Sequence, residues 1–122
     1  MPRTVDLFLD SDQPLDRFAD YLADLTGCQF QGCPGRTRFA MQDGDVTAFL
    51  AEHDFLDDED LPLSEFRFVL SAVVRGDGNI EATPETACLR RVNARLRDDG
   101  RHASLLVLDL ERPDSLQVGP CD

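Results

Sequence analysis

The sequence of 122 residues contains no lysine, because all twelve of its basic residues are arginine. It therefore has no phosphate-binding Walker lysine, no Schiff-base lysine and no lysine general base. A Gly-x-Ser-x-Gly nucleophile motif is also missing, and there are only two histidines, His53 and His102. From these absences we expect a protein that is not an enzyme and that binds no cofactor.

No long apolar run follows the first residues, Met1 to Thr4, so we expect neither a signal peptide nor a membrane anchor. This predicts a cytoplasmic protein, in which cysteines are kept as reduced thiols. The prediction covers all four cysteines, and we interpret the first and third as small buried hydrophobes. In chain order they are Cys28, Cys33, Cys88 and Cys121.

Metal-binding patterns are weak in this sequence. Cys28 and Cys33 have nearly the spacing of a zinc knuckle, but no second tight pair accompanies them. Counting from Asp57, the glycine that an EF-hand loop needs at its sixth position is replaced by Pro62. We predict no metal site, while a weak cation site of another kind and a catalytic pair of Cys33 with His53 stay open as alternatives.

The composition fits one globular domain spanning residues 1–122, with residues 113–122 as an irregular tail. Apolar residues make up 42% of the chain, including eight phenylalanines. That content is enough for one hydrophobic core and argues against a disordered acidic chain.

Two helices are predicted from cap residues and periodic apolar positions. The first follows Asp10–Asp12, has Pro14 just inside its start and ends at Gly27. The second begins with Thr83 as N-cap and Pro84 at its first position, and it ends at Gly100.

Six strands are predicted from alternating or continuous apolar runs. In the first, Val5, Leu7 and Leu9 alternate with Asp6 and Phe8, which indicates one apolar face. The last is apolar enough to be central in a sheet. The predicted strands are Thr4–Leu9, Cys28–Gln31, Arg36–Gln42, Val46–Ala51, Glu65–Arg75 and Ser104–Leu110.

The resulting order is β-α-β-β-β-β-α-β, which is typical of an α+β two-layer sandwich. We expect a mainly antiparallel sheet with both helices on one face. Strands one and six are placed near the middle of that sheet.

The formal net charge is −12, and nearly all of the acidic excess lies in the first half of the chain. Residues 1–65 hold 15 acidic residues and 4 arginines, whereas residues 66–122 hold 9 and 8. Such a charge repels nucleic acid and anionic membranes and favours a cationic protein as partner. Solubility alone is the alternative explanation.

The first concentration of acid is Asp16, Asp20 and Asp24, which recur every four residues on the first helix, opposite its apolar stripe. Like charges at this spacing cost roughly 0.2–0.5 kcal/mol per pair on an isolated helix. Aspartate is also a poor helix former. Stability alone therefore does not explain this face, and we predict that it binds a partner.

The second concentration is the segment from Glu52 to Asp60, with six acids in nine positions. An apolar pair surrounded by carboxylates is typical of an interface anchor with a charged rim. The alternative is an ordinary solvated loop over a buried pair. The predicted partner-binding residues here are Asp54, Phe55, Leu56, Asp57, Asp58, Glu59 and Asp60.

The second helix has the opposite charge on its exposed side. Its arginines either pair with the acids of the first helix and the acidic segment, or form a local anion site, and we favour the pairing. The residues are Arg90, Arg91, Arg95 and Arg97, with Arg101 following.

The stretch from His53 to Phe68, HDFLDDEDLPLSEFRF, resembles small acidic bacterial immunity proteins of polymorphic toxin systems, as does Val5–Asp10 followed by an amphipathic helix. The resemblance implies inhibition of a toxin by direct binding inside the cell that makes it. Many toxins of that kind are basic nucleases. A DNA mimic that blocks a nucleic-acid-binding protein, and a small-ligand binder or enzyme of unknown reaction, are the alternatives.

Overall fold

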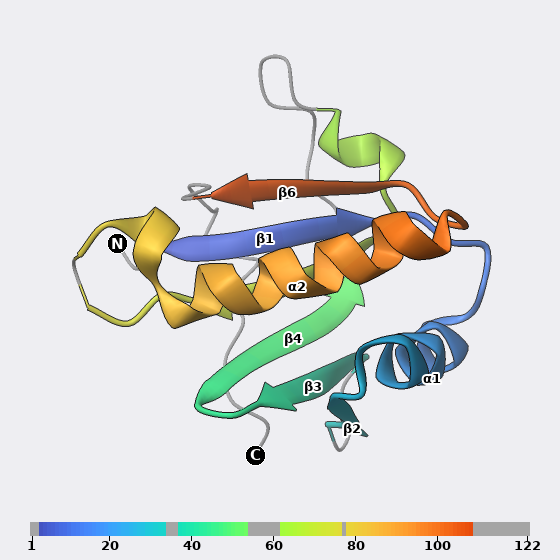
Figure 1. Cartoon of the computed structure of the whole chain (residues 1–122). Coiled ribbons are helices and arrows are strands. Elements are labelled where there is room, and N and C mark those ends of the chain that lie inside the picture. The colour runs from blue at the N-terminus through green and yellow to red at the C-terminus, as the bar shows by residue number, and fades with distance from the viewer. Residues whose placement is uncertain (1–2, 34–36, 54–61, 77, 109–122) are drawn as a thin grey trace.

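The computed structural model describes residues 3–33, 37–53, 62–76 and 78–108, which form one six-stranded sheet with two helices on one of its faces (Figure 1). Every strand pairing is antiparallel. The strands are β1 (Thr4–Leu9), β2 (Gln29–Gly32), β3 (Arg38–Asp43), β4 (Val46–Glu52), β5 (Phe68–Val73) and β6 (Ser104–Leu108). The helices are α1 (Leu15–Thr26) and α2 (Pro84–Asp99), and short 3₁₀ turns form at Leu63–Glu65 and Ile80–Ala82. The predicted α+β class and element order are confirmed.

The ends of the helices follow their local signals. The Thr83 side chain accepts a hydrogen bond from the backbone N–H of Thr86 (3.2 Å) and so caps α2. Both helices end on a glycine in the left-handed conformation, with φ of 71° at Gly27 and at Gly100, as predicted. Pro14 lies outside α1 instead of inside it, because its ψ of 155° is extended and the helix begins one residue later.

The sheet order is β2-β3-β4-β5-β1-β6, so the prediction that strands one and six lie near the middle is wrong, because β1 is second from one edge and β6 is the last strand. Within the described part of the chain, β6 pairs with β1 alone and forms one edge. It looks central in sequence because apolar residues cover both of its faces. Leu106 and Leu108 pack against the core beneath the helices, and Leu105 and Val107 pack on the opposite side.

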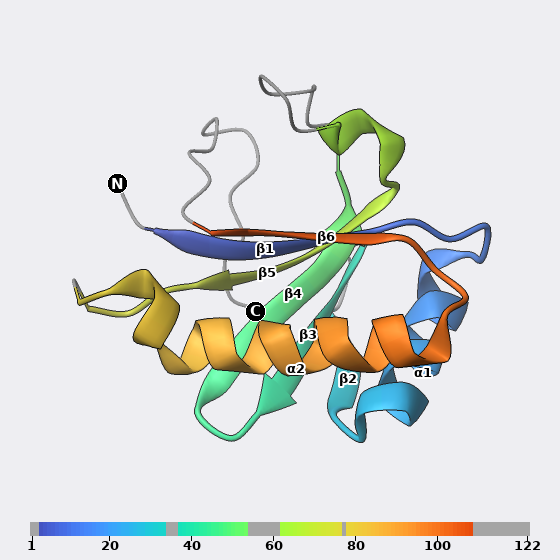
Figure 2. The same ribbon diagram turned by 45° about the horizontal axis from the view of Figure 1, so that its top comes forward.

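Both helices lie on the same face of the sheet (Figure 2). A second, smaller apolar cluster lies on the opposite face. Phe8, Leu63 and Val69 form its buried centre. The expected apolar face of β1 is confirmed, since Val5, Leu7 and Leu9 lie in the main core. The sequence did not predict that the other face is buried too: Phe8 has no exposed surface, and all six residues of the strand are buried. Leu63 belongs to a 3₁₀ turn, and the strand predicted from Glu65 begins only at Phe68.

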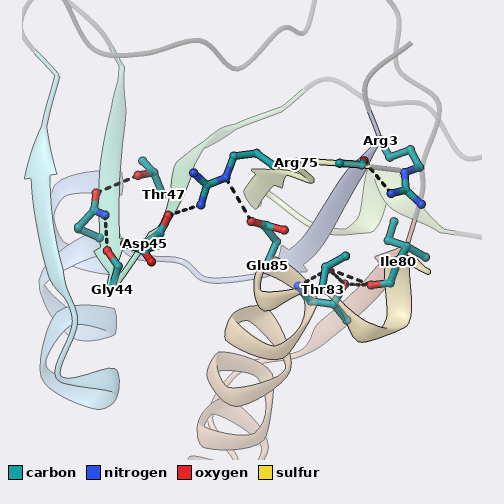
Figure 3. Close-up of polar contacts among 11 residues, drawn as sticks. Arg3, Gly44, Asp45, Thr47, Arg75, Ile80, Thr83 and Glu85 are labelled. Carbon is teal, nitrogen blue, oxygen red and sulfur yellow. Dashed lines mark hydrogen bonds and ion pairs between the residues drawn. The ribbon is translucent and has the colours of Figure 1, made fainter. Parts of the chain in front are cut away.

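The start of α2 is tied to the sheet by a polar network (Figure 3). Arg75 donates to the carbonyl of Asp45 (2.8 Å), and its Nε lies 3.7 Å from Oε2 of the buried Glu85. Glu85 stands in the first turn of α2, where the helix dipole favours a negative charge. Arg3 donates to the carbonyls of Gly76 and Gly78 at 2.9 and 2.6 Å. These contacts fix α2 over the sheet and so position its far end.

Among the residues that the structure describes, no helix is long and apolar enough to cross a membrane.

Candidate functional site

The outer face of α1 carries the three aspartates that the sequence singled out. Asp16, Asp20 and Asp24 are all exposed. The opposite side of the helix buries Phe18, Ala19 and Leu22 in the core. The predicted geometry of this acidic face, defined by its three aspartates, is therefore confirmed, whereas its role in binding stays a prediction.

None of these aspartates takes part in an ion pair within the described ranges. The ion pairs found there join Arg67 to Glu52, Arg75 to Glu85, Arg91 to Asp43 and Arg101 to Asp99. The preferred pairing of α2 arginines with the acids of α1 is therefore not found. Arg91 instead reaches β3, where it lies 2.7 Å from Asp43, because α2 crosses the sheet beside that strand's end. Within the described ranges, the three aspartates of the acidic face therefore form no ion pair, and the cation nearest to them in sequence is Arg17 of the same helix.

Most of the second predicted surface lies outside the described residues. This concerns Asp54, Phe55, Leu56, Asp57, Asp58, Glu59 and Asp60. Beside that segment, Glu52 ends β4 and pairs with Arg67, their atoms 2.8 Å apart. His53 packs edge-on against Phe8, with ring centroids 5.0 Å apart.

A pocket of about 400 Å³ lies where the loop from β1 to α1 meets the loop from α2 to β6. The two loops lie side by side at one end of the sheet (Figure 1). The backbone N–H of Asp10 donates to the carbonyl of Ala103 (3.1 Å), and Nδ1 of His102 lies 3.1 Å from the carbonyl of Asp10. The pocket is lined by Asp10, Ser11, Asp12, Gln13, Tyr21, Arg101, His102 and Ala103.

Three other contacts hold this pocket in shape. Arg67 donates to the carbonyl of Gln13 (2.8 Å) and so anchors the β1–α1 loop from the neighbouring strand end. The hydroxyl of Tyr21 donates to Asp99 Oδ2 at 2.5 Å, which joins α1 to the last turn of α2. His102 meets the Tyr21 ring edge-on, with centroids 4.9 Å apart. Tyr21 is thus held between the two helices, and the His102 ring packs against it from the α2–β6 loop.

Tyr21 is the only tyrosine in a chain without tryptophan, so its ionisation can be followed alone by ultraviolet absorbance. Burial, and then the hydrogen bond to Asp99, raise its pKa from 10.0 to about 12. Because the folded-state pKa of Tyr21 lies above its ordinary value, the protonated hydroxyl stabilises the folded state below pH 10. This stabilisation of the fold is lost as the pH rises through 12.

We expect Asp99→Asn to lower the pKa of Tyr21. The neighbouring exposed Asp98→Asn serves as control, and an unchanged titration in Asp99→Asn would contradict the assignment.

The cysteines differ from the prediction of four reduced thiols. Cys33 is disulfide-bonded, which also removes it as the thiol of a catalytic pair with His53. Cys28 and Cys88 are free. Cys88 is fully buried in the core and Cys28 packs against it, as their interpretation as small hydrophobes predicted. Burial, and then a hydrogen bond to Asp43, raise the pKa of Cys88 to about 12, so this thiol is a poor nucleophile at neutral pH.

The question for the described part of the chain is whether it holds a metal site or a nucleophile paired with a base. No three His, Cys, Asp or Glu side chains gather there in a way that could hold a metal ion. In the pocket, Ser11 Oγ accepts a hydrogen bond from the N–H of Gln13 (3.1 Å), and no hydrogen bond from Ser11 to His102 is found. The pocket therefore lacks a nucleophile paired with a base.

Sequence reasoning missed the pocket residues Tyr21 and His102. Tyr21 lies 78 positions from Asp99, and His102 lies 92 positions from Asp10. The one local feature of the sequence that lies at the pocket is the run Asp10–Asp12. Its residues are typical of N-caps, but they line the pocket and no side chain caps α1.

No family model matches the chain, and comparison with curated proteins and with solved structures finds no significant match.

Proposed function

We propose that this chain is a non-enzymatic inhibitor that binds a cationic protein through the acidic face of α1, and that it acts as an immunity protein against a toxin. The observation that carries the proposal is the exposure of Asp16, Asp20 and Asp24, none of which forms an ion pair among the described residues. Electrostatic complementarity of this kind accelerates encounter and selects partners by charge.

The arrangement costs the fold stability, which supports a role outside folding. Two like-charge pairs, Asp16 with Asp20 and Asp20 with Asp24, each cost roughly 0.2–0.5 kcal/mol. Asp24 also stands near the negative end of the helix dipole, where an acid is unfavourable. A solvent-facing helix surface of mixed charge would avoid both costs. A cationic partner supplies the missing positive charge and turns the repulsion into attraction.

The proposal places the protein in the cytoplasm, where an inhibitor meets a toxin as the toxin is made. The disulfide at Cys33 is the observation that counts against this location, because disulfides are rare in the cytoplasm. The acidic face does not depend on it, since its aspartates stand on α1 and carry their charge in either redox state.

The test is a growth assay with the genes on either side of the gene for this chain. Each is expressed in a bacterial host with and without the chain. We expect one of them to arrest growth and the chain to restore it by forming a complex that co-purifies. If no flanking product is toxic, or if the chain leaves the arrest unchanged, the immunity role is wrong. Displacement of the chain from its partner by duplex DNA would show instead that it mimics DNA.

A further inference from the structure

The pocket beside α1 carries an uncompensated negative charge of its own. Arg101 is the one arginine among its lining residues, and its Nε lies 3.6 Å from Asp99 Oδ2. That contact leaves the exposed carboxylates of Asp10 and Asp12 without an ion pair among the described residues. A concave site with two free carboxylates favours a positively charged group.

The shape and lining of the pocket narrow the class of cation. Its volume of about 400 Å³ falls in the range of small-ligand pockets, about 300–1,000 Å³. Its wall includes the half-buried rings of Tyr21 and His102, held nearly perpendicular at an interplanar angle of 70°. A guanidinium group is planar, stacks on aromatic rings and is bound by carboxylates through paired hydrogen bonds. The ammonium group of lysine is a more strongly hydrated point charge, so contact with aromatic rings stabilises it less than it stabilises a guanidinium group.

We propose that this pocket is a socket for an arginine side chain of the cationic partner, with Asp10 and Asp12 binding the guanidinium group and Tyr21 forming the wall on which it packs. The inference rests on the proposed function for the identity of the partner. Tyr21 belongs to α1, and Asp10 and Asp12 lie in the loop just before it, so the socket adjoins the helix that carries the acidic face. The acidic face would attract the partner over long range, and the socket would fix its orientation.

The test uses the isolated protein and a small probe, Nα-acetyl-arginine methylamide, at constant ionic strength. Tyrosine fluorescence reports on this pocket alone, because Tyr21 is the only tyrosine and there is no tryptophan. We expect a saturable change with a dissociation constant on the order of millimolar, as befits a single side chain. The matched uncharged probe, Nα-acetyl-citrulline methylamide, has nearly the same shape and should produce no saturable change.

Two variants with the same change in net charge locate the site. Asp12→Asn removes a carboxylate of the pocket, and we expect it to weaken binding of the arginine probe about tenfold or more. Asp98→Asn removes an exposed carboxylate that does not line the pocket and should leave binding unchanged. Equal binding of the citrulline probe, or equal affinity of Asp12→Asn and the wild type, would overturn the socket.

The outcomes separate this inference from the proposed function. If the arginine probe binds at Asp12 and no flanking gene product is toxic, the arginine socket is supported and the proposed immunity role is wrong. If the chain neutralises a toxin but the probe does not bind, the inhibitor role stands and the socket is wrong.

Discussion

Replacement of Asp16, Asp20 and Asp24 together by asparagine is expected to slow association with the cationic partner about tenfold or more at low salt. The three carboxylates make no ion pair within the described ranges, so their field extends into solvent toward an approaching protein. The rate is measured by stopped flow or surface plasmon resonance with the toxin that the growth assay identifies. Because salt screens exposed charges, the difference between variant and wild type should shrink as salt concentration rises.

A control variant separates the acidic face from net charge in general. Asp45→Asn, Glu81→Gln and Asp98→Asn neutralise three exposed acids elsewhere on the molecule and change the net charge by the same amount. We expect this control to slow association far less than the α1 variant. Equal effects of the two variants would mean that overall charge, and not the face of α1, guides the encounter.

The free energy of unfolding of the triple asparagine variant of α1 shows whether the variant is correctly folded. Relief of two like-charge pairs should raise the free energy of unfolding by about 0.4–1 kcal/mol at low salt. A variant that binds more slowly while it unfolds less readily cannot owe its defect to misfolding. Loss of stability on neutralisation would show that the aspartates are paired in solution, and would remove the main support for a binding role.

The helices could be predicted from the sequence because their signals are local. Gly27 and Gly100 end α1 and α2, and Thr83 caps α2, all within one turn of the helix that each bounds. Strand order could not be predicted, because β6 joins β1 across nearly the whole chain and its apolar residues face two separate clusters. An edge strand covered on both faces has the composition of a central one.

The candidate site shows the same division between local and distant contacts. The acidic face follows from a four-residue period within one helix, so the sequence sufficed to find it. The pocket is assembled by two loops from opposite ends of the chain, and its key contact joins Tyr21 to Asp99. No periodicity connects these residues, and it is the antiparallel pairing of β1 with β6 that brings the two loops to the same end of the sheet.

Phe8→Ala is expected to lower the free energy of unfolding by about 3–5 kcal/mol, the cost of truncating a fully buried phenylalanine. Phe8 has no exposed surface although it points away from both helices. It faces Val69 on β5 and Leu105 on β6, and the ring of Phe66 lies 6.5 Å from its own. Urea denaturation at equilibrium measures the change.

The size of this effect decides whether the sheet has one apolar layer or two. If the face without helices were an ordinary solvated surface, truncation of Phe8 would cost within about 0.5 kcal/mol, as surface substitutions usually do. Val73 on β5 provides the matched control, since it is apolar, stands on the same face and is 40% exposed. Val73→Ala should therefore change stability little. A large loss for Phe8→Ala with a small one for Val73→Ala would locate the second layer over β1, β5 and β6, where Leu63 and the rings of Phe66 and His53 surround Phe8.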